Sequence, residues 1–152
     1  MRPLLLVALL AESACSTPDP VTADTLPLPP FAYEAPLAGA YESRLDLAVV
    51  ALHRPLREAY GPFDPEIVHL EESATWDAVE AFYTEAFSSG DLAASGFERT
   101  DWTSADPDRY RVALWTRDRG DRVAVAFVPG RPGDPKPFLV LMTPRAGSSP
   151  RG

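Results

Sequence analysis

Hydrophobic residues recur every three or four positions in two stretches of the chain, which is the spacing of an amphipathic helix. The first stretch begins after Ser43 and ends at Gly61-Pro62, a pair that terminates helices. Its apolar positions are Leu45, Val49, Leu52, Leu56 and Tyr60. Pro55 lies inside this stretch and cannot donate a backbone hydrogen bond, so we expect the helix to be kinked or to divide near His53.

The second helical stretch has clear boundary signals. Thr75 is a good N-cap, Asp77 places a negative charge in the first turn, and Gly90 is a natural stop. The apolar face of this predicted helix consists of Trp76, Val79, Tyr83, Ala86 and Phe87.

Short apolar or alternating runs predict strands. They are Glu66–Leu70, Tyr110–Thr116, Arg122–Val128 and Phe138–Met142. The connections Arg117–Asp121 and Pro129–Asp134 contain the glycine, proline and aspartate typical of hairpin turns. The pattern predicts an α+β domain over residues 35–144, an antiparallel β-meander of about four strands packed against one long and one kinked helix.

Alternation along the strands predicts which side chains share a face. We expect one face to pack on the second helix; it consists of Tyr110, Val112, Leu114, Val123, Val125 and Phe127. The opposite face would carry Arg111, Ala113, Trp115 and Arg117 beside Arg122, Ala124 and Ala126. Phe138–Met142 is apolar on both faces, which favours a central or helix-covered strand over a bare edge.

The first fifteen residues have the composition of an export signal. Arg2 precedes the apolar run Leu4–Ala11, which is too short to span a bilayer. The ending Ser13-Ala14-Cys15 resembles a bacterial lipobox, in which the cysteine becomes the lipidated first residue, although Glu12 stands where leucine is usual. Two alternatives remain: secretion after cleavage near Ala11-Glu12-Ser13, or an uncleaved N-terminus with a free thiol.

This pattern divides the chain into four parts. We expect a signal peptide over residues 1–14, and then a lipidated Cys15 with a proline-rich tether over residues 15–34. The single domain over residues 35–144 would be followed by a disordered tail over residues 145–152. The predicted location is extracytoplasmic, anchored to the membrane of a bacterial cell envelope, or secreted if Cys15 is not acylated.

Charge and cysteine content narrow the classes of partner. The net charge of −8 argues against nucleic acid and against electrostatic adhesion to anionic lipid, so membrane attachment would depend on Cys15. One cysteine cannot form an intramolecular disulfide. His53 and His69 have no metal-ligand spacing, so we expect no metal and no cofactor.

The second predicted helix contains the pattern Ser/Thr-x-x-x-Val-x-x-Phe-Tyr, followed by a glycine-aromatic pair. The matching residues are Thr75, Val79, Phe82, Tyr83, Gly96 and Phe97. This pattern resembles a group of small exported bacterial lipoprotein domains, in which a lipoprotein signal and a proline-rich stretch come first and a β-meander follows. The resemblance implies an exported α+β domain and carries no assigned biochemical activity.

Two groups of residues are candidates for chemistry. Arg111, Trp115, Arg117 and Arg122 would form a cationic face with an aromatic ring, suited to a carboxylate, a phosphate or a sugar. The alternative is that this face is solvated or is covered by acidic residues of a helix. We therefore predict a non-catalytic module that binds a protein or envelope component. The alternative is a ligand-binding or hydrolytic domain centred on His69 and the neighbouring Glu71-Glu72 pair.

Overall fold

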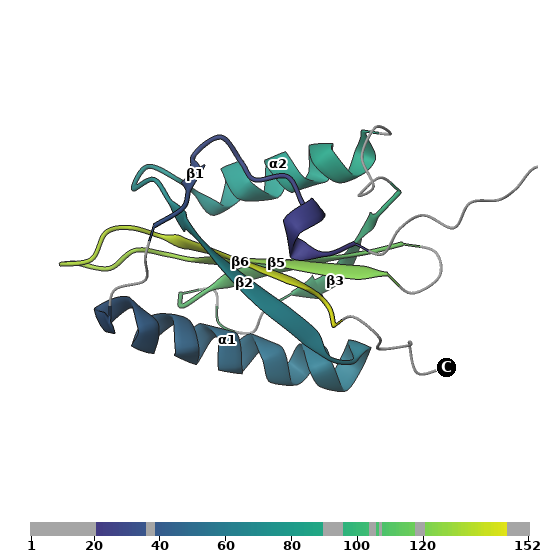
Figure 1. Ribbon diagram of the computed structural model, residues 1–152, viewed down its shortest axis with the longest axis horizontal. Helices are drawn as coiled ribbons and strands as arrows, with labels where there is room; N and C mark the ends of the chain where they lie inside the picture. Colours follow the sequence, from purple (N-terminus) through teal and green to yellow (C-terminus); the bar gives the residue numbers. More distant parts are fainter. Residues whose placement is uncertain are drawn as a thin grey trace, which may run out of the picture.

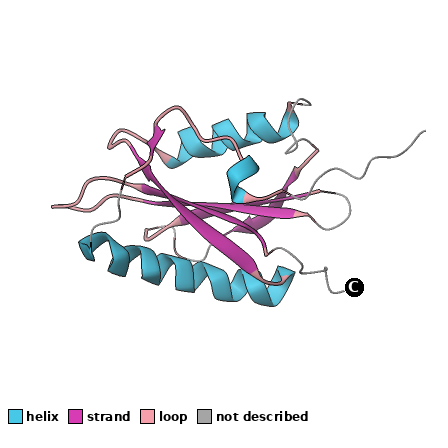
Figure 2. Cartoon of the chain, viewed as in Figure 1, coloured by secondary structure: helices cyan, strands magenta, loops and turns pink. Residues whose placement is uncertain are grey.

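The chain folds into one antiparallel sheet with a helix on each face (Figures 1 and 2). This computed structural model describes residues 21–35, 39–89, 96–103, 106, 108–117 and 121–145. The predicted signal peptide, Cys15, Gly90 and the tail after residue 145 lie outside the described residues. The strands are β1 (Ala32–Tyr33), β2 (Phe63–Leu70), β3 (Glu98–Thr103), β4 (Arg111–Thr116), β5 (Arg122–Val128) and β6 (Phe138–Pro144). Their order across the sheet is β1-β2-β6-β5-β4-β3, so the α+β class is confirmed, with six strands in place of about four.

The helix α2 (Trp76–Ser88) forms as its caps predict. The Thr75 hydroxyl accepts a hydrogen bond from the Ala78 amide at 3.3 Å, and Asp77 lies in the first turn. The buried residues of α2 are Val79, Tyr83, Ala86 and Phe87, as the apolar stripe predicts. This stripe packs on one face of the sheet (Figure 1).

The helix α1 (Gly39–Tyr60) covers the other face and runs through Pro55 as one element, so the predicted division near His53 is wrong. Proline removes the bond to the carbonyl four residues earlier, which belongs to Ala51. Both Ala51 and Pro55 are exposed, so water can satisfy this carbonyl and the helix continues. The helix ends at Tyr60, and Gly61 follows it with a φ of 94°, a conformation that favours glycine.

The strand β6 lies in the middle of the sheet, between β2 and β5, which confirms that it is not an edge. Leu139 and Leu141 face α2, and Phe138, Val140 and Met142 face α1. These five side chains have no exposed surface. A strand buried on both faces needs apolar residues at every position, and this explains the continuous hydrophobic run.

The predicted distribution of side chains over the two faces is wrong for β4. In the β4–β5 register Val112 pairs with Ala126 and Leu114 with Ala124, and all four face α1. Ala113 and Trp115 instead share the α2 face with Val123 and Val125. Five residues, 117–121, separate the closing pair Thr116 and Arg122, and this odd number sets the register. Because a shift of one residue reverses a strand's faces, the turn length decides which residues meet α2.

The segment 21–34, which we call the strap, is part of the domain. Val21 and Leu26 are each 5% exposed and belong to the core beneath α2. The strap contains one short 3-10 helix, η1 (Ala23–Thr25), and the strand β1, which pairs with the end of β2. The predicted tether over residues 15–34 therefore needs correction, because the chain is already folded at Val21 and the domain does not begin at residue 35.

One hydrogen bond joins the strap to α2. The Tyr83 hydroxyl donates to the carbonyl oxygen of Pro27 at 3.1 Å. Burial, together with the carboxylate of Glu66, raises the pKa of Tyr83, so the phenol remains a protonated donor at neutral pH. The strap is thus held by the burial of Val21 and Leu26 and by the hydrogen bond from Tyr83 to Pro27, which lies between Leu26 and β1 in the chain.

We expect Tyr83→Phe to lower the free energy of unfolding by about 1 kcal/mol, because it removes a buried hydrogen bond and little volume. Cleavage of the strap by a protease should become faster. Urea unfolding and limited proteolysis measure the two effects. The matched control is Tyr60→Phe, which removes a hydroxyl on the α1 side. Equal effects of the two variants on strap cleavage would contradict the role given to Tyr83.

Among the described residues, no helix combines the length and the hydropathy that crossing a membrane requires.

Candidate functional site

The four residues of the predicted cationic face do not form one exposed surface. Trp115 is 1% exposed and lies in the core beneath α2. Its ring centroid is 5.2 Å from that of Phe87 and 6.3 Å from that of Tyr83. An indole in this position contributes packing and is closed to a solvent-borne ligand.

Arg117 closes the turn between β4 and β5. Its Nε donates to the Asp121 carboxylate at 3.1 Å, and its backbone amide donates to the Asp121 carbonyl at 2.9 Å. The guanidinium carbon lies 4.7 Å from the centroid of the Phe97 ring. The Arg117 side chain is only 10% exposed, so it links the end of β4 to Asp121 and covers an aromatic ring of the core.

Arg122 lies on the opposite face, at the C-terminus of α1. Its Nη1 donates to the Tyr60 carbonyl at 2.6 Å, and its guanidinium carbon is 5.0 Å from the Tyr60 ring centroid. The last carbonyls of a helix lack intrahelical donors and carry partial negative charge. Arg122 therefore joins the end of α1 to β5 by satisfying one of these carbonyls.

Arg111 is the exposed member of the four. It begins β4, six positions from Arg117, which corresponds to about 20 Å along a strand. The structure therefore separates Arg111 from Arg117, places Arg122 across the sheet and buries Trp115. Sequence reasoning missed this because two of the four side chains are engaged by residues far away in the sequence, Phe97 and Tyr60.

His69 lies in an aromatic cluster at the end of the sheet where β1 meets β2. Its ring centroid is 5.6 Å from that of Tyr33 and 5.1 Å from that of Phe138. The Lys136 ammonium lies 5.6 Å from the Tyr33 ring. Burial, and then the charge of Lys136, lower the pKa of His69 below 6.5, so the imidazole is neutral at pH 7.

The neighbouring carboxylates do not share this buried setting. Glu71 and Glu72 follow the end of β2 and are exposed, whereas His69 is 6% exposed. Among the described residues, no three His, Cys, Asp or Glu side chains converge as metal ligands would. The arrangement around His69 can pack a neutral imidazole between two rings, which is a structural role.

The lowered pKa predicts a pH effect on stability. Well above pH 6.5 the histidine is neutral in both the folded and the unfolded chain, and its contribution to stability is complete. As the pH falls below 6.5 the unfolded chain takes up the proton more readily, so the contribution is lost. We expect the free energy of unfolding to fall less between pH 7.5 and pH 5 in His69→Phe than in the wild type.

Urea unfolding at the two pH values measures this difference. The matched control is His53→Gln, which removes the other histidine of the chain, at a partly exposed position on α1. If the free energy of unfolding fell as much in His69→Phe as in the wild type, the pH dependence could not be assigned to His69.

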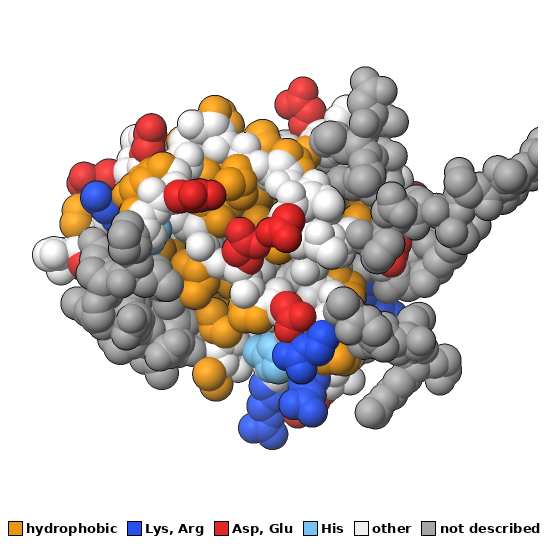
Figure 3. All heavy atoms as spheres, viewed as in Figure 1, with side chains coloured by type: hydrophobic (Ala, Val, Ile, Leu, Met, Phe, Trp, Pro, Cys, Tyr) orange, Lys and Arg blue, Asp and Glu red, His pale blue; other side chains and the backbone are white. Residues whose placement is uncertain are grey.

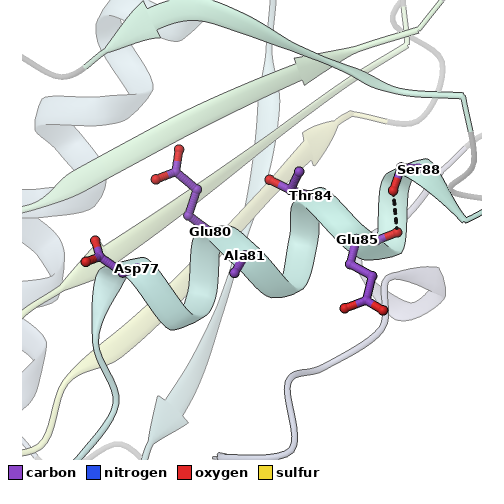
Figure 4. Close-up of a pocket in the computed structure, with 6 residues that line it drawn as sticks. All are labelled: Asp77, Glu80, Ala81, Thr84, Glu85 and Ser88. Carbon is purple, nitrogen blue, oxygen red and sulfur yellow. Dashed lines mark hydrogen bonds between the residues drawn. The ribbon is translucent and has the colours of Figure 1, made fainter.

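A shallow hollow follows the outer side of α2 (Figure 4). Its lining residues are Asp77, Glu80, Ala81, Thr84, Glu85 and Ser88. Glu80 is paired with Arg99 of β3 at 2.6 Å, and the Ser88 hydroxyl donates to the Glu85 carbonyl at 3.0 Å. The hollow is therefore lined by an acidic, solvated face of α2. The ion pair between Glu80 and Arg99 links this face to the edge strand β3.

Charge is unevenly distributed over the surface. Figure 3 shows acidic side chains spread over the upper part of the view, while basic side chains gather below, on the side of α1. Arg54 and Arg57 are exposed on α1, and Arg54 pairs with Glu58 at 3.1 Å. Arg145 pairs with Asp64 at 2.8 Å across the ends of β6 and β2. Exposed pairs such as these two are worth at most about 1 kcal/mol each.

Comparison of the chain with family models, with curated protein sequences and with solved structures finds no match.

Proposed function

We propose that this protein is a lipid-anchored extracytoplasmic lipoprotein whose folded domain is a non-catalytic binding module for a protein or another envelope component. One observation carries the proposal: a basic residue and a short apolar run lead directly to the only cysteine of the chain, Cys15. Acyl chains on this sulfur would provide a durable anchor, because one chain alone binds a membrane only marginally and several bind it stably.

The fold supports the proposal in two ways. The described core begins at Val21, six positions after Cys15, so acylation of the cysteine would leave the packing of this core unchanged. The side chains best suited to chemistry contribute to the fold itself: Arg117 closes a turn, Arg122 binds the end of α1 and His69 packs between aromatic rings. A domain built in this way acts through its outer surface, by binding.

Acylation is tested by incorporation of radiolabelled palmitate in a bacterial host. The wild-type chain should be labelled and recovered with membranes, and Cys15→Ala should be unlabelled. Since residues 21–145 contain the packed core, Cys15→Ala should unfold at the same urea concentration as the wild type. An unlabelled wild-type chain that keeps its first methionine and remains soluble in the cell interior would overturn the proposal.

The position of Glu12 supplies a second, graded test. A lipobox usually has leucine three residues before the cysteine, so Glu12→Leu should increase the fraction of processed, labelled chain. Pulse labelling of precursor and product measures this fraction. Unchanged processing in Glu12→Leu together with labelling that requires Cys15 would show that the negative charge is tolerated.

A further inference from the structure

The strap leaves little chain between the domain and the proposed anchor. Val21 and Leu26 are buried, and the Thr25 hydroxyl donates to the Thr22 carbonyl at 2.8 Å, so the segment is packed from its first described residue. Only residues 16–20 separate Cys15 from Val21. Six steps along a fully extended chain span at most about 20 Å, so the entry point of the domain lies within that distance of the acylated sulfur.

The strap enters the domain at one end of its long axis. In Figure 1 the purple start of the described chain lies towards the right, where α1 and α2 end and where β4 is followed by β5. The connection between β5 and β6, residues 129–137, extends from the left end. The two ends of the molecule are therefore at very different distances from the start of the described chain, where the strap enters the domain.

The size of the domain decides which end can face the membrane. A folded unit of about 125 residues has a radius of gyration of about 14 Å, and hence a diameter of about 35 Å. For the residue 129–137 end to face the bilayer, the entry point would have to be held about 35 Å above the surface. The available chain reaches about 20 Å, which is too short.

We propose that, in the lipid-anchored protein, the end bearing the β4–β5 turn faces the phospholipid headgroups and the hairpin 129–137 points away from the membrane. This inference rests on the proposed function, because it takes Cys15 as the anchor. The membrane-facing end includes the turn fixed by Arg117 and the end of α1 bound by Arg122. The outward end presents exposed Arg131 and Lys136 to the surroundings, so a partner would meet the domain there.

The chain is suited to a direct distance measurement, because Cys15 is its only cysteine and Lys136 its only lysine. The chain from Cys15 onwards, the product of the proposed processing, is coupled through its thiol to maleimide-bearing phosphatidylethanolamine in phosphatidylcholine vesicles. A donor dye is attached to the lysine, and an acceptor dye is carried on the headgroups. The label on the α-amine is common to all variants and cancels in the comparison.

The matched variant combines Lys136→Arg with Arg57→Lys, which moves the only lysine to the last turn of α1. Energy transfer to the vesicle surface should be higher from position 57 than from position 136. Inserting about 30 Gly and Ser residues between Pro20 and Val21, with a root-mean-square span of about 30 Å, should remove the difference.

Equal transfer from the two positions with the native linker, or higher transfer from position 136, would overturn the inference. A difference that survives the insertion would also overturn it, because chain length would then not be the cause. The thiol attachment is made chemically, so a failure of palmitate labelling in cells would refute the proposed function without affecting this measurement of orientation.

Discussion

Trp115→Ala should lower the free energy of unfolding by about 3 to 5 kcal/mol, a large part of the stability of a domain this size. Trp115 is the largest fully buried side chain described, and its ring lies against Phe87 and Tyr83 of α2. Truncation to alanine would leave a cavity between the sheet and the helix, and the loss of packing would add to the loss of buried apolar surface.

Urea unfolding followed by circular dichroism measures this effect. Arg111→Ala is the matched control, four positions earlier on the same strand and exposed, and it should change stability by no more than about 0.5 kcal/mol. A Trp115→Ala variant as stable as the control would show that the indole lies at the surface, on the face that strand alternation predicts from the sequence.

Gly130→Ala should destabilise the domain by about 3 kcal/mol, because the connection between β5 and β6 has no room for a side chain at this position. A Cβ atom at residue 130 would overlap the carbonyl group of Pro135. The atom in the way belongs to the backbone and cannot rotate aside, so the two sides of the connection 129–137 would have to separate. Separating them would also weaken the contacts between β5 and β6, which this connection joins.

Gly133 provides the matched control in the same hairpin. Arg131 and Asp134 exchange two backbone hydrogen bonds, and Pro132-Gly133 forms the tip with a φ of 84° at the glycine. A Cβ there would meet no atom within 4 Å, so Gly133→Ala bears only the cost of the left-handed conformation, about 1 kcal/mol. Thermal unfolding of the two variants should rank Gly130→Ala as the less stable, and the reverse order would contradict the steric explanation.

The sequence was sufficient to predict those helices and strands whose caps or hydrophobic patterns lie within the element itself. The cap at Thr75, the apolar stripe of α2 and the double-sided hydrophobicity of Phe138–Met142 each follow from neighbouring residues alone. The strand β3 has no such signal, because Glu98–Thr103 is polar at an edge and its register shifts between Arg99 and Thr103. The strand β1 has two residues and depends entirely on its partner β2.

The strap was missed for a different reason. Its proline-rich composition is typical of an extended spacer, and its burial depends on partners distant in sequence, such as Tyr83, 56 positions beyond Pro27. The same limitation affected the candidate site, since the faces of β4 depend on the turn 117–121 and on which helix covers each face. Ala124 and Ala126 could have indicated the face of β5 that a helix covers, because small residues allow a helix such as α1 to approach the sheet closely.

The position of β6 has a consequence for the order of folding. The last strand of the described residues, β6, lies between β2 and β5, so these two cannot be joined through the sheet until Phe138–Pro144 has been made. Contacts between segments so distant in sequence form slowly. A growing chain of this topology therefore keeps β1-β2 and β3-β4-β5 as two separate parts of the sheet until β6 has been made.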